Sequence, residues 1–130
     1  MKIQIRPNLY LGDKDAFASF AEIKADGITS VVIVSSDLPV PTEDQTGIRV
    51  HKMSMIQGPN YGWVKDLACH VPKYLMQNGE VVLIQSVTGM QRGAYIAARC
   101  ICEMENKSIY DVFLEIQKLI PKLDLSKVYF

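Results

Sequence analysis

The sequence predicts an α/β fold, a three-layer sandwich with a mostly parallel central sheet of four or five strands flanked by helices. Two patterns predict it. The runs 28–34 and 81–84 are nearly continuous, β-branched and apolar, which is typical of parallel strands covered on both faces. Segments with apolar residues at helical spacing separate such strands along the chain, as parallel pairing requires. A ligand site is then expected at the carboxyl end of the central strand.

The first 34 residues predict a hairpin, a helix and a buried strand. Residues 2–5 alternate polar and apolar and 9–11 resume the pattern after a Pro-Asn turn, which indicates a short hairpin at the edge of the sheet. Asp13 is a candidate N-cap for an amphipathic helix that ends at Gly27. The strand 28–34 then belongs in the middle of the sheet.

The next segments predict a loop, a strand and a helix. Residues 35–47 are polar and rich in turn formers, so we expect a surface loop, and 48–55 return as a strand. Residues 56–62 contain two glycines and a proline and predict a turn or flap rather than a helix. An apolar stripe at helical spacing follows over 63–75, in which Pro72 either kinks the helix or marks its true start.

The last part of the chain predicts the central strand and two more helices. Asn78-Gly79 ends the preceding helix before the strand 81–84, and residues 94–104 are small or apolar almost all round, as in a buried helix. Ser108 is a fair N-cap for an amphipathic helix that Pro121 ends.

Length and composition narrow the functional classes. The 130 residues, 48% of them hydrophobic, suit a single domain over 1–130 with one core. Lys plus Arg and Asp plus Glu number 14 each, so nucleic acid and anionic membranes are not expected partners. Neither a leader nor an apolar run of ~18 residues is seen. The expected location is therefore intracellular, in the cytoplasm, with the nucleus as a second compartment.

The cysteines and histidines do not predict a metal site. Cys69, Cys100 and Cys102 lack the spacing of zinc ligands, so we expect thiols and neither metal nor cofactor. His51 lies on a predicted strand and His70 on a predicted helix, and each is interpreted as a structural or surface residue.

The turn after the central strand predicts an anion site. Gly89 allows a tight loop, and Arg92 lies at the start of the helix that follows. Successive N–H groups of such a loop, together with the positive end of the helix dipole, favour an anion, and the guanidinium adds a planar fork of donors. We expect a phosphate or sulfate to fit the loop. Its predicted phosphate-binding residues are Ser86, Val87, Thr88, Gly89, Met90, Gln91 and Arg92.

This loop resembles that of the cysteine-dependent protein tyrosine phosphatases, whose signature is a His-Cys pair and, after five residues, an Arg followed by Ser or Thr. Here Gln85 and Ser86 stand for the pair, Arg92 for the Arg, and Gly93 for the Ser or Thr. Three further segments resemble the compact dual-specificity branch in the same order, so the resemblance covers nearly the whole chain: residues 5–12, Ala16 and residues 27–34.

The resemblance implies a protein-tyrosine-phosphatase-like fold and a lost activity. Ser86 takes the position of the nucleophilic Cys. The general-acid Asp of the family precedes the nucleophile on a flap, at a position that falls on Gln57 or a neighbour, and no Asp or Glu occurs between Asp44 and Asp66. An alcohol is far less acidic than a thiol, whose pKa is ~8.5. The changes together therefore favour a catalytically inactive, STYX-like pseudophosphatase.

Three functions remain open at this stage. The first is a signalling module that binds phosphorylated Tyr, Ser or Thr in a partner protein or peptide without hydrolysing it. The second is an enzyme, either an unusual active dual-specificity phosphatase or an active one trapped by an engineered Cys-to-Ser change. The third is an interaction scaffold without anion affinity, which would meet its partner through Tyr61, Trp63 and the loop 35–47.

Overall fold

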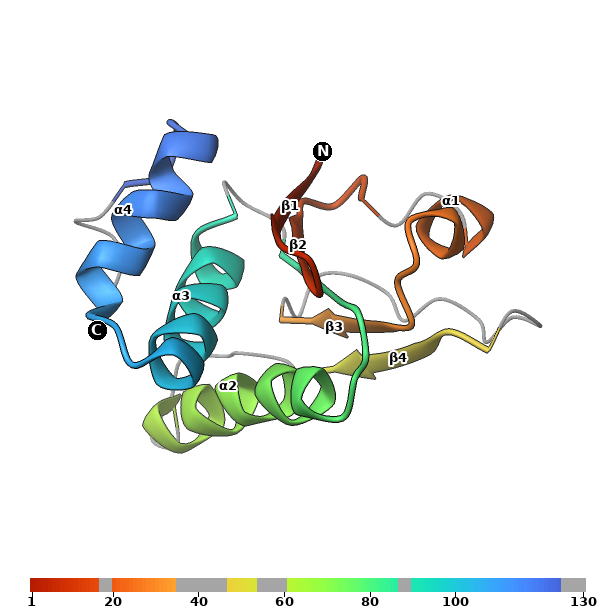
Figure 1. Cartoon of the computed structure of the whole chain (residues 1–130), viewed down its shortest axis with the longest axis horizontal. Coiled ribbons are helices and arrows are strands. Elements are labelled where there is room, and N and C mark those ends of the chain that lie inside the picture. Colours follow the sequence, from red (N-terminus) through yellow and green to blue (C-terminus); the bar gives the residue numbers. More distant parts are fainter. Residues whose placement is uncertain (17–19, 35–46, 54–60, 87–89, 125–130) are drawn as a thin grey trace.

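The computed structural model describes residues 1–16, 20–34, 47–53, 61–86 and 90–124, and for 61–64 the backbone only. These residues form five strands and four helices (Figure 1). In chain order they are β1 (Lys2–Arg6), β2 (Leu9–Gly12), α1 (Phe20–Ala25), β3 (Ser30–Ile33), β4 (Arg49–Lys52), α2 (Tyr61–Gln77), β5 (Val82–Gln85), α3 (Gln91–Glu105) and α4 (Ile109–Leu119).

The strands form one sheet in the order β1-β2-β5-β3-β4. Only β1 and β2 run antiparallel, as the hairpin predicted from the sequence, and every other neighbouring pair is parallel. Val82 at the start of β5 pairs with Leu9 on one side and with Ser30 on the other. The mostly parallel sheet is confirmed, and β5 is its central strand.

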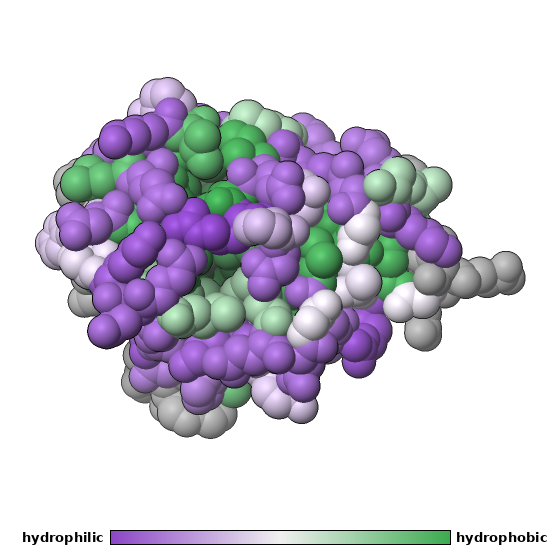
Figure 2. Space-filling model, viewed as in Figure 1, coloured by the Kyte–Doolittle hydropathy of each residue, from purple (hydrophilic) through white to green (hydrophobic). Residues whose placement is uncertain are grey.

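Helices cover both faces of the sheet. On one face, Ile23 of α1 packs in a cluster with Val31, Ile33 and Leu83. On the other face lie α2 and α3, and α4 packs on the outer side of α3 (Figure 1). Hydrophilic side chains cover much of the face shown in Figure 2, with hydrophobic ones visible between them.

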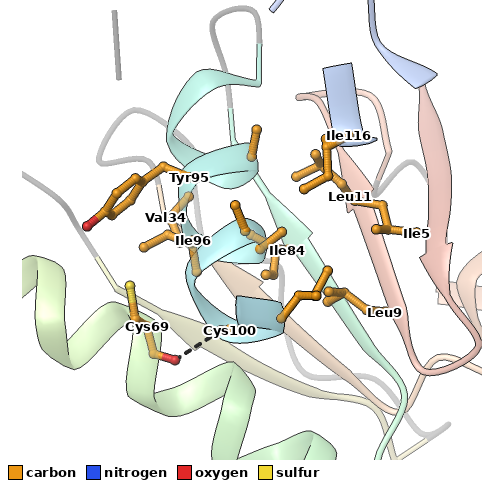
Figure 3. Close-up of a cluster of buried hydrophobic side chains, with 14 of the residues drawn as sticks. Ile5, Leu9, Leu11, Val34, Cys69, Ile84, Tyr95, Ile96, Cys100 and Ile116 are labelled. Carbon is orange, nitrogen blue, oxygen red and sulfur yellow. Dashed lines mark hydrogen bonds between the residues drawn. The ribbon is translucent and has the colours of Figure 1, made fainter. Parts of the chain in front are cut away.

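The larger core lies between the sheet, α2 and α3 (Figure 3). Ile84 of β5 faces Ile96 of α3, and both are fully buried. A hydrogen bond joins α2 to α3 within this core, because Cys100 Sγ donates to the Cys69 carbonyl at 3.2 Å. Among the described residues, no helix combines the length and the apolar character that crossing a membrane requires.

The structure corrects the predicted start of α1. Residues 14–16 form a turn and not the first turn of a helix, so Asp13 is not the N-cap of α1. Asp13 instead closes a turn directly after β2: its Oδ1 accepts a hydrogen bond from the Asp15 N–H, and its carbonyl accepts one from the Ala16 N–H. In an Asx turn the Asp side chain accepts a hydrogen bond from a backbone N–H two residues later, much as an N-cap side chain does. An Asp at this place in the sequence is therefore compatible with either structure.

Helix α2 also differs from its prediction. It begins at Tyr61, so Tyr61 and Gly62 belong to the helix and not to the preceding flap. Pro72 lies inside the helix, and the alternative that it marks the true start is wrong. Pro72 is buried, so packing against the core offsets the lost backbone donor. The loop prediction for 35–46 lies outside the described residues.

Candidate phosphate-binding site

Ser86 lies at the carboxyl end of the central strand, held by neighbours on both sides. Its N–H donates to the Gly12 carbonyl at 3.0 Å, and the Val34 N–H donates to the Gln85 carbonyl at 2.9 Å. These bonds extend the parallel pairing one step beyond β5. The chain therefore leaves the sheet at a fixed point, where open α/β sheets place their ligand sites. Residues 87–89 lie outside the described residues.

The Ser86 side chain is buried and accepts one hydrogen bond. It is 2% exposed, and the Gly93 N–H donates to its Oγ at 3.3 Å. A serine becomes a nucleophile when a base accepts its proton. Among the described residues, no base hydrogen-bonds to Ser86 Oγ. The side chain is therefore a neutral hydroxyl.

Gln85 ties the site to the turn that follows β2. Its side chain is 3% exposed, and its Nε2 donates to the Asp13 carbonyl at 3.1 Å and to the Lys14 carbonyl at 3.3 Å. The side-chain NH2 group thus donates to two backbone carbonyls of this turn. Without it, both carbonyls would have fewer hydrogen-bond partners. Gln85 acts as a positioning residue.

The chain enters α3 through Met90. Its backbone is left-handed, with φ 59° and ψ 20°, and its side chain is fully buried in the core. The first helical bond runs from the Ala94 N–H to the Met90 carbonyl at 2.8 Å. A left-handed residue other than glycine is strained, and the buried side chain stabilises it here. Met90 can contribute to an anion site only through its backbone.

The next two residues have different surroundings. The Gln91 amide, oriented by its partners, accepts from the Asp124 N–H at 2.8 Å and donates to the Asp124 carbonyl at 3.3 Å. Arg92 is exposed, and among the described residues no hydrogen bond or ion pair engages it. Of the described residues predicted to bind phosphate, Arg92 is thus the one whose cationic side chain is available to a ligand.

Gly93 is packed too tightly to carry a side chain. A Cβ at this position would lie 2.6 Å from Leu11 Cδ1 and 2.9 Å from Ser86 Oγ. Leu11 is fully buried, so its side chain has little room to retreat. The position that bears Ser or Thr in the resembling family is therefore filled by a neighbouring strand. Sequence reasoning missed this contact, because nothing in the chain pairs Leu11 with Gly93.

None of the three cysteines can replace the missing thiolate. Burial raises the pKa of Cys69 to about 12 and moves the pKa of Cys100 further up, while the pKa of Cys102 is also raised by burial. All three lie on α2 or α3 and not on the loop. A catalytic thiol needs the opposite shift.

The histidines lie elsewhere. His51 on β4 and His70 on α2 line a hollow beside the edge strand. His70 is exposed and His51 is half-buried, in agreement with their interpretation as structural or surface residues. The general-acid position, Gln57, lies outside the described residues. Among those described, no group of three or more possible metal ligands occurs.

No protein-family model and no curated protein sequence matches the chain. Solved structures do. The chain is similar to human DUSP28, with 19% identity, a TM-score of 0.79, and 95% of this chain and 83% of that chain covered. It is similar to human tyrosine phosphatase-like serine/threonine/tyrosine-interacting protein, with 20% identity, a TM-score of 0.76 and coverage of 95% and 86%. It is also similar to a leucine rich repeat and phosphatase domain containing protein from Entamoeba histolytica. The identity is 21%, the TM-score is 0.72, and the match covers 95% of this chain and 81% of that chain. The chain therefore has the dual-specificity phosphatase fold, within the protein-tyrosine-phosphatase-like class.

Proposed function

We propose that this protein binds phosphorylated Tyr, Ser or Thr side chains of partner proteins and does not hydrolyse them. The observation that carries the proposal is Ser86, a buried neutral hydroxyl at the end of the central strand, directly before the loop that leads to Arg92. A signalling role in the cytoplasm follows from the ligand, since protein phosphorylation is an intracellular signal.

The case for binding rests on charge and position. Arg92 lies in the first turn of α3, where the helix dipole favours an anion, and its guanidinium is exposed. Hydrogen bonds to charged groups contribute roughly 1.5–3 kcal/mol each. An anionic thiolate repels a phosphate dianion, whereas the neutral Ser86 hydroxyl can donate to it. The serine is therefore compatible with equal or tighter binding.

The case against hydrolysis rests on missing groups. The phosphatase reaction in the resembling family uses a thiolate and a general acid. Ser86 replaces the thiol, burial keeps the remaining cysteines protonated, and the amide of Gln57 at the acid position is not acidic enough to protonate a leaving oxygen.

Further replacements around Ser86 support its natural origin over an engineered trap. A laboratory Cys-to-Ser change leaves the rest of the site as the active enzyme had it. Here Gln85 stands in place of the family's His and donates to the carbonyls of Asp13 and Lys14, and Gly93 stands in place of the Ser or Thr. A trap would need neither of these two changes.

Calorimetry with a phosphotyrosine peptide and a phosphothreonine peptide tests binding. We expect saturable heat with at least one of them and a loss of tenfold or more in affinity for Arg92→Ala. Lys118→Ala is the control, because Lys118 is an exposed cationic residue on a different element, α4, and this variant should bind as wild type. Equal, negligible heats from wild type and Arg92→Ala would favour the scaffold without anion affinity.

A turnover assay with an aryl phosphate tests the inactive site. We expect no release of phosphate above a Ser86→Ala control. Ser86→Cys alone should restore little activity, and Ser86→Cys with Gln57→Asp should restore more, because the double variant supplies both nucleophile and acid. Full activity from the single change would identify an engineered trap and overturn the proposal.

A further inference from the structure

A hollow between β4 and α2 is separate from the phosphate loop. It encloses a volume of about 610 Å³, within the range of pockets for small molecules. Arg49 on β4 pairs with Ser30, and Ser30 pairs with Val82, the first residue of β5. Ser86 follows the last residue of β5, so the Arg49 end of the hollow lies roughly 13 Å from Ser86 along the strand direction. A ligand in the hollow therefore uses different residues from a phosphate at Arg92.

The hollow has an apolar floor with an aromatic ring at its rim. Val71 and Leu75 on the inner side of α2 contribute aliphatic surface, and Tyr74 beside them is 66% exposed. An exposed ring beside an apolar floor suits a flat apolar body.

The polar part of the lining is basic. Arg49, His51, His70 and Lys73 line the hollow together with Gln77, and no acidic residue is among the described residues that line it. The Arg49 side chain is 63% exposed and contacts Glu80 through one nitrogen, Nη2, at 2.6 Å. Its remaining donors have no partner among the described residues. Lys73 is also paired, with Glu103 at 3.2 Å, and its side chain is 25% exposed. Arg49 is the more exposed of the two cations and is therefore the one more accessible to a ligand.

One buried nitrogen in this wall lacks a partner. His51 Nε2 is inaccessible to solvent and makes no hydrogen bond in the part of the chain that the structure describes. Because this nitrogen has no surface open to solvent, a ligand in the hollow does not reach it, and His51 contributes to the lining through the rest of its side chain.

We propose that this hollow is a second binding site, which takes a small aromatic acid: a flat apolar body with one anionic group. The body would lie on Val71, Leu75 and Tyr74, and the anionic group would meet Arg49 beside the His51 ring. The volume of the hollow favours a small molecule, and the exposed guanidinium of Arg49 favours an anion.

The test uses the fluorescence of 1-anilinonaphthalene-8-sulfonate, and of N-phenyl-1-naphthylamine, which has the same ring system without the charge. We expect saturable one-to-one binding of the sulfonate by the folded wild type. Tyr74→Ala should weaken both probes about fivefold or more, and its matched control is Tyr110→Ala, an exposed tyrosine on α4. Arg49→Gln should weaken only the sulfonate, and its control is Lys52→Gln on the opposite face of the same strand.

Two measurements separate this site from the phosphate loop and from unfolding. Arg92→Ala and excess inorganic phosphate should leave binding of the sulfonate unchanged, whatever the phosphopeptide experiment shows. Circular dichroism should give each variant the wild-type spectrum. Binding that is not saturable, that weakens equally in the control variants, or that is lost with Arg92→Ala would overturn the proposal.

Discussion

Leu11 occupies the space that a side chain at Gly93 would need, since a Cβ there would lie 2.6 Å from Leu11 Cδ1. The contact joins β2 to the first turn of α3, directly beside Ser86. We predict that Gly93→Ser, which restores a residue of the resembling family, lowers the free energy of unfolding by about 1–3 kcal/mol. Helix propensity alone would give the opposite sign, because serine favours a helix more than glycine does.

The matched test of this packing is a double-mutant cycle. Leu11→Ala alone should destabilise the protein through the cavity that it leaves, and Gly93→Ser should cost less in that background than in the wild type. Unfolding in urea gives the four free energies. Additive effects would show that the two positions are not coupled.

Gln85 should matter for stability because its amide serves two carbonyls. We predict that Gln85→Leu lowers the free energy of unfolding by about 1–3 kcal/mol, since it leaves the Asp13 and Lys14 carbonyls with fewer donors. Gln4→Leu is the control, because Gln4 is exposed and its one bond, to Pro7, is long at 3.4 Å. Chemical denaturation that finds equal losses for both variants would contradict the positioning role of Gln85.

The cysteines should differ in reactivity. Burial raises the pKa of Cys69 and Cys100, and both side chains are buried in the core, whereas Cys102 is partly exposed. With an aromatic disulfide reagent near pH 8, we predict that Cys102 reacts first and that the other two react only as the protein unfolds. Cys102→Ser should remove the early phase. A second fast thiol in that variant would show a reactive cysteine that the structure does not account for.

The sequence was sufficient to predict the parts of the fold that local patterns encode. The β-branched run before Ser86 predicted the central strand, and the Pro7-Asn8 turn predicted the hairpin, because strand periodicity and turn chemistry act over a few residues. It failed where a local signal has two outcomes. Asp13 can cap a helix or close a turn, and only the tertiary structure decides between them.

The candidate site shows the same division. Its place after β5 was predicted, and Ser86 and Arg92 were recognised from their spacing. The contacts of the neighbouring residues were not predicted. Gln85 bonds to the turn after β2, Gln91 to the chain after α4, and Gly93 packs against β2. Contacts between segments so far apart in sequence leave no periodicity to read.

Arg6 links three elements, and its carboxylate partners should make stability depend on pH. From β1 its Nε contacts Glu105 of α3 at 2.9 Å, and its Nη1 contacts Glu115 of α4 at 2.7 Å. The hydrogen bond from Arg6 lowers the pKa of Glu105 to about 2, and Arg6 also lowers the pKa of Glu115. An unfolded glutamate titrates near ~4.3. The stability that the folded protein gains from these ion pairs is therefore present above that pH and is lost as the pH falls from there towards 2.

We predict that Glu105→Gln reduces the acid-induced loss of stability. Both carboxylates are partly exposed, so solvent screening limits the pair to about 1 kcal/mol, well below what the pKa shift alone suggests. Between about pH 7 and pH 3, wild type should therefore lose about 1 kcal/mol more of its free energy of unfolding than Glu105→Gln does. Glu22→Gln is the control, because Glu22 is 64% exposed and its contact with Lys2 is long at 4.0 Å. Urea unfolding at a series of pH values measures the difference, and parallel curves for wild type and Glu105→Gln would show that Arg6 does not hold this carboxylate in the folded state.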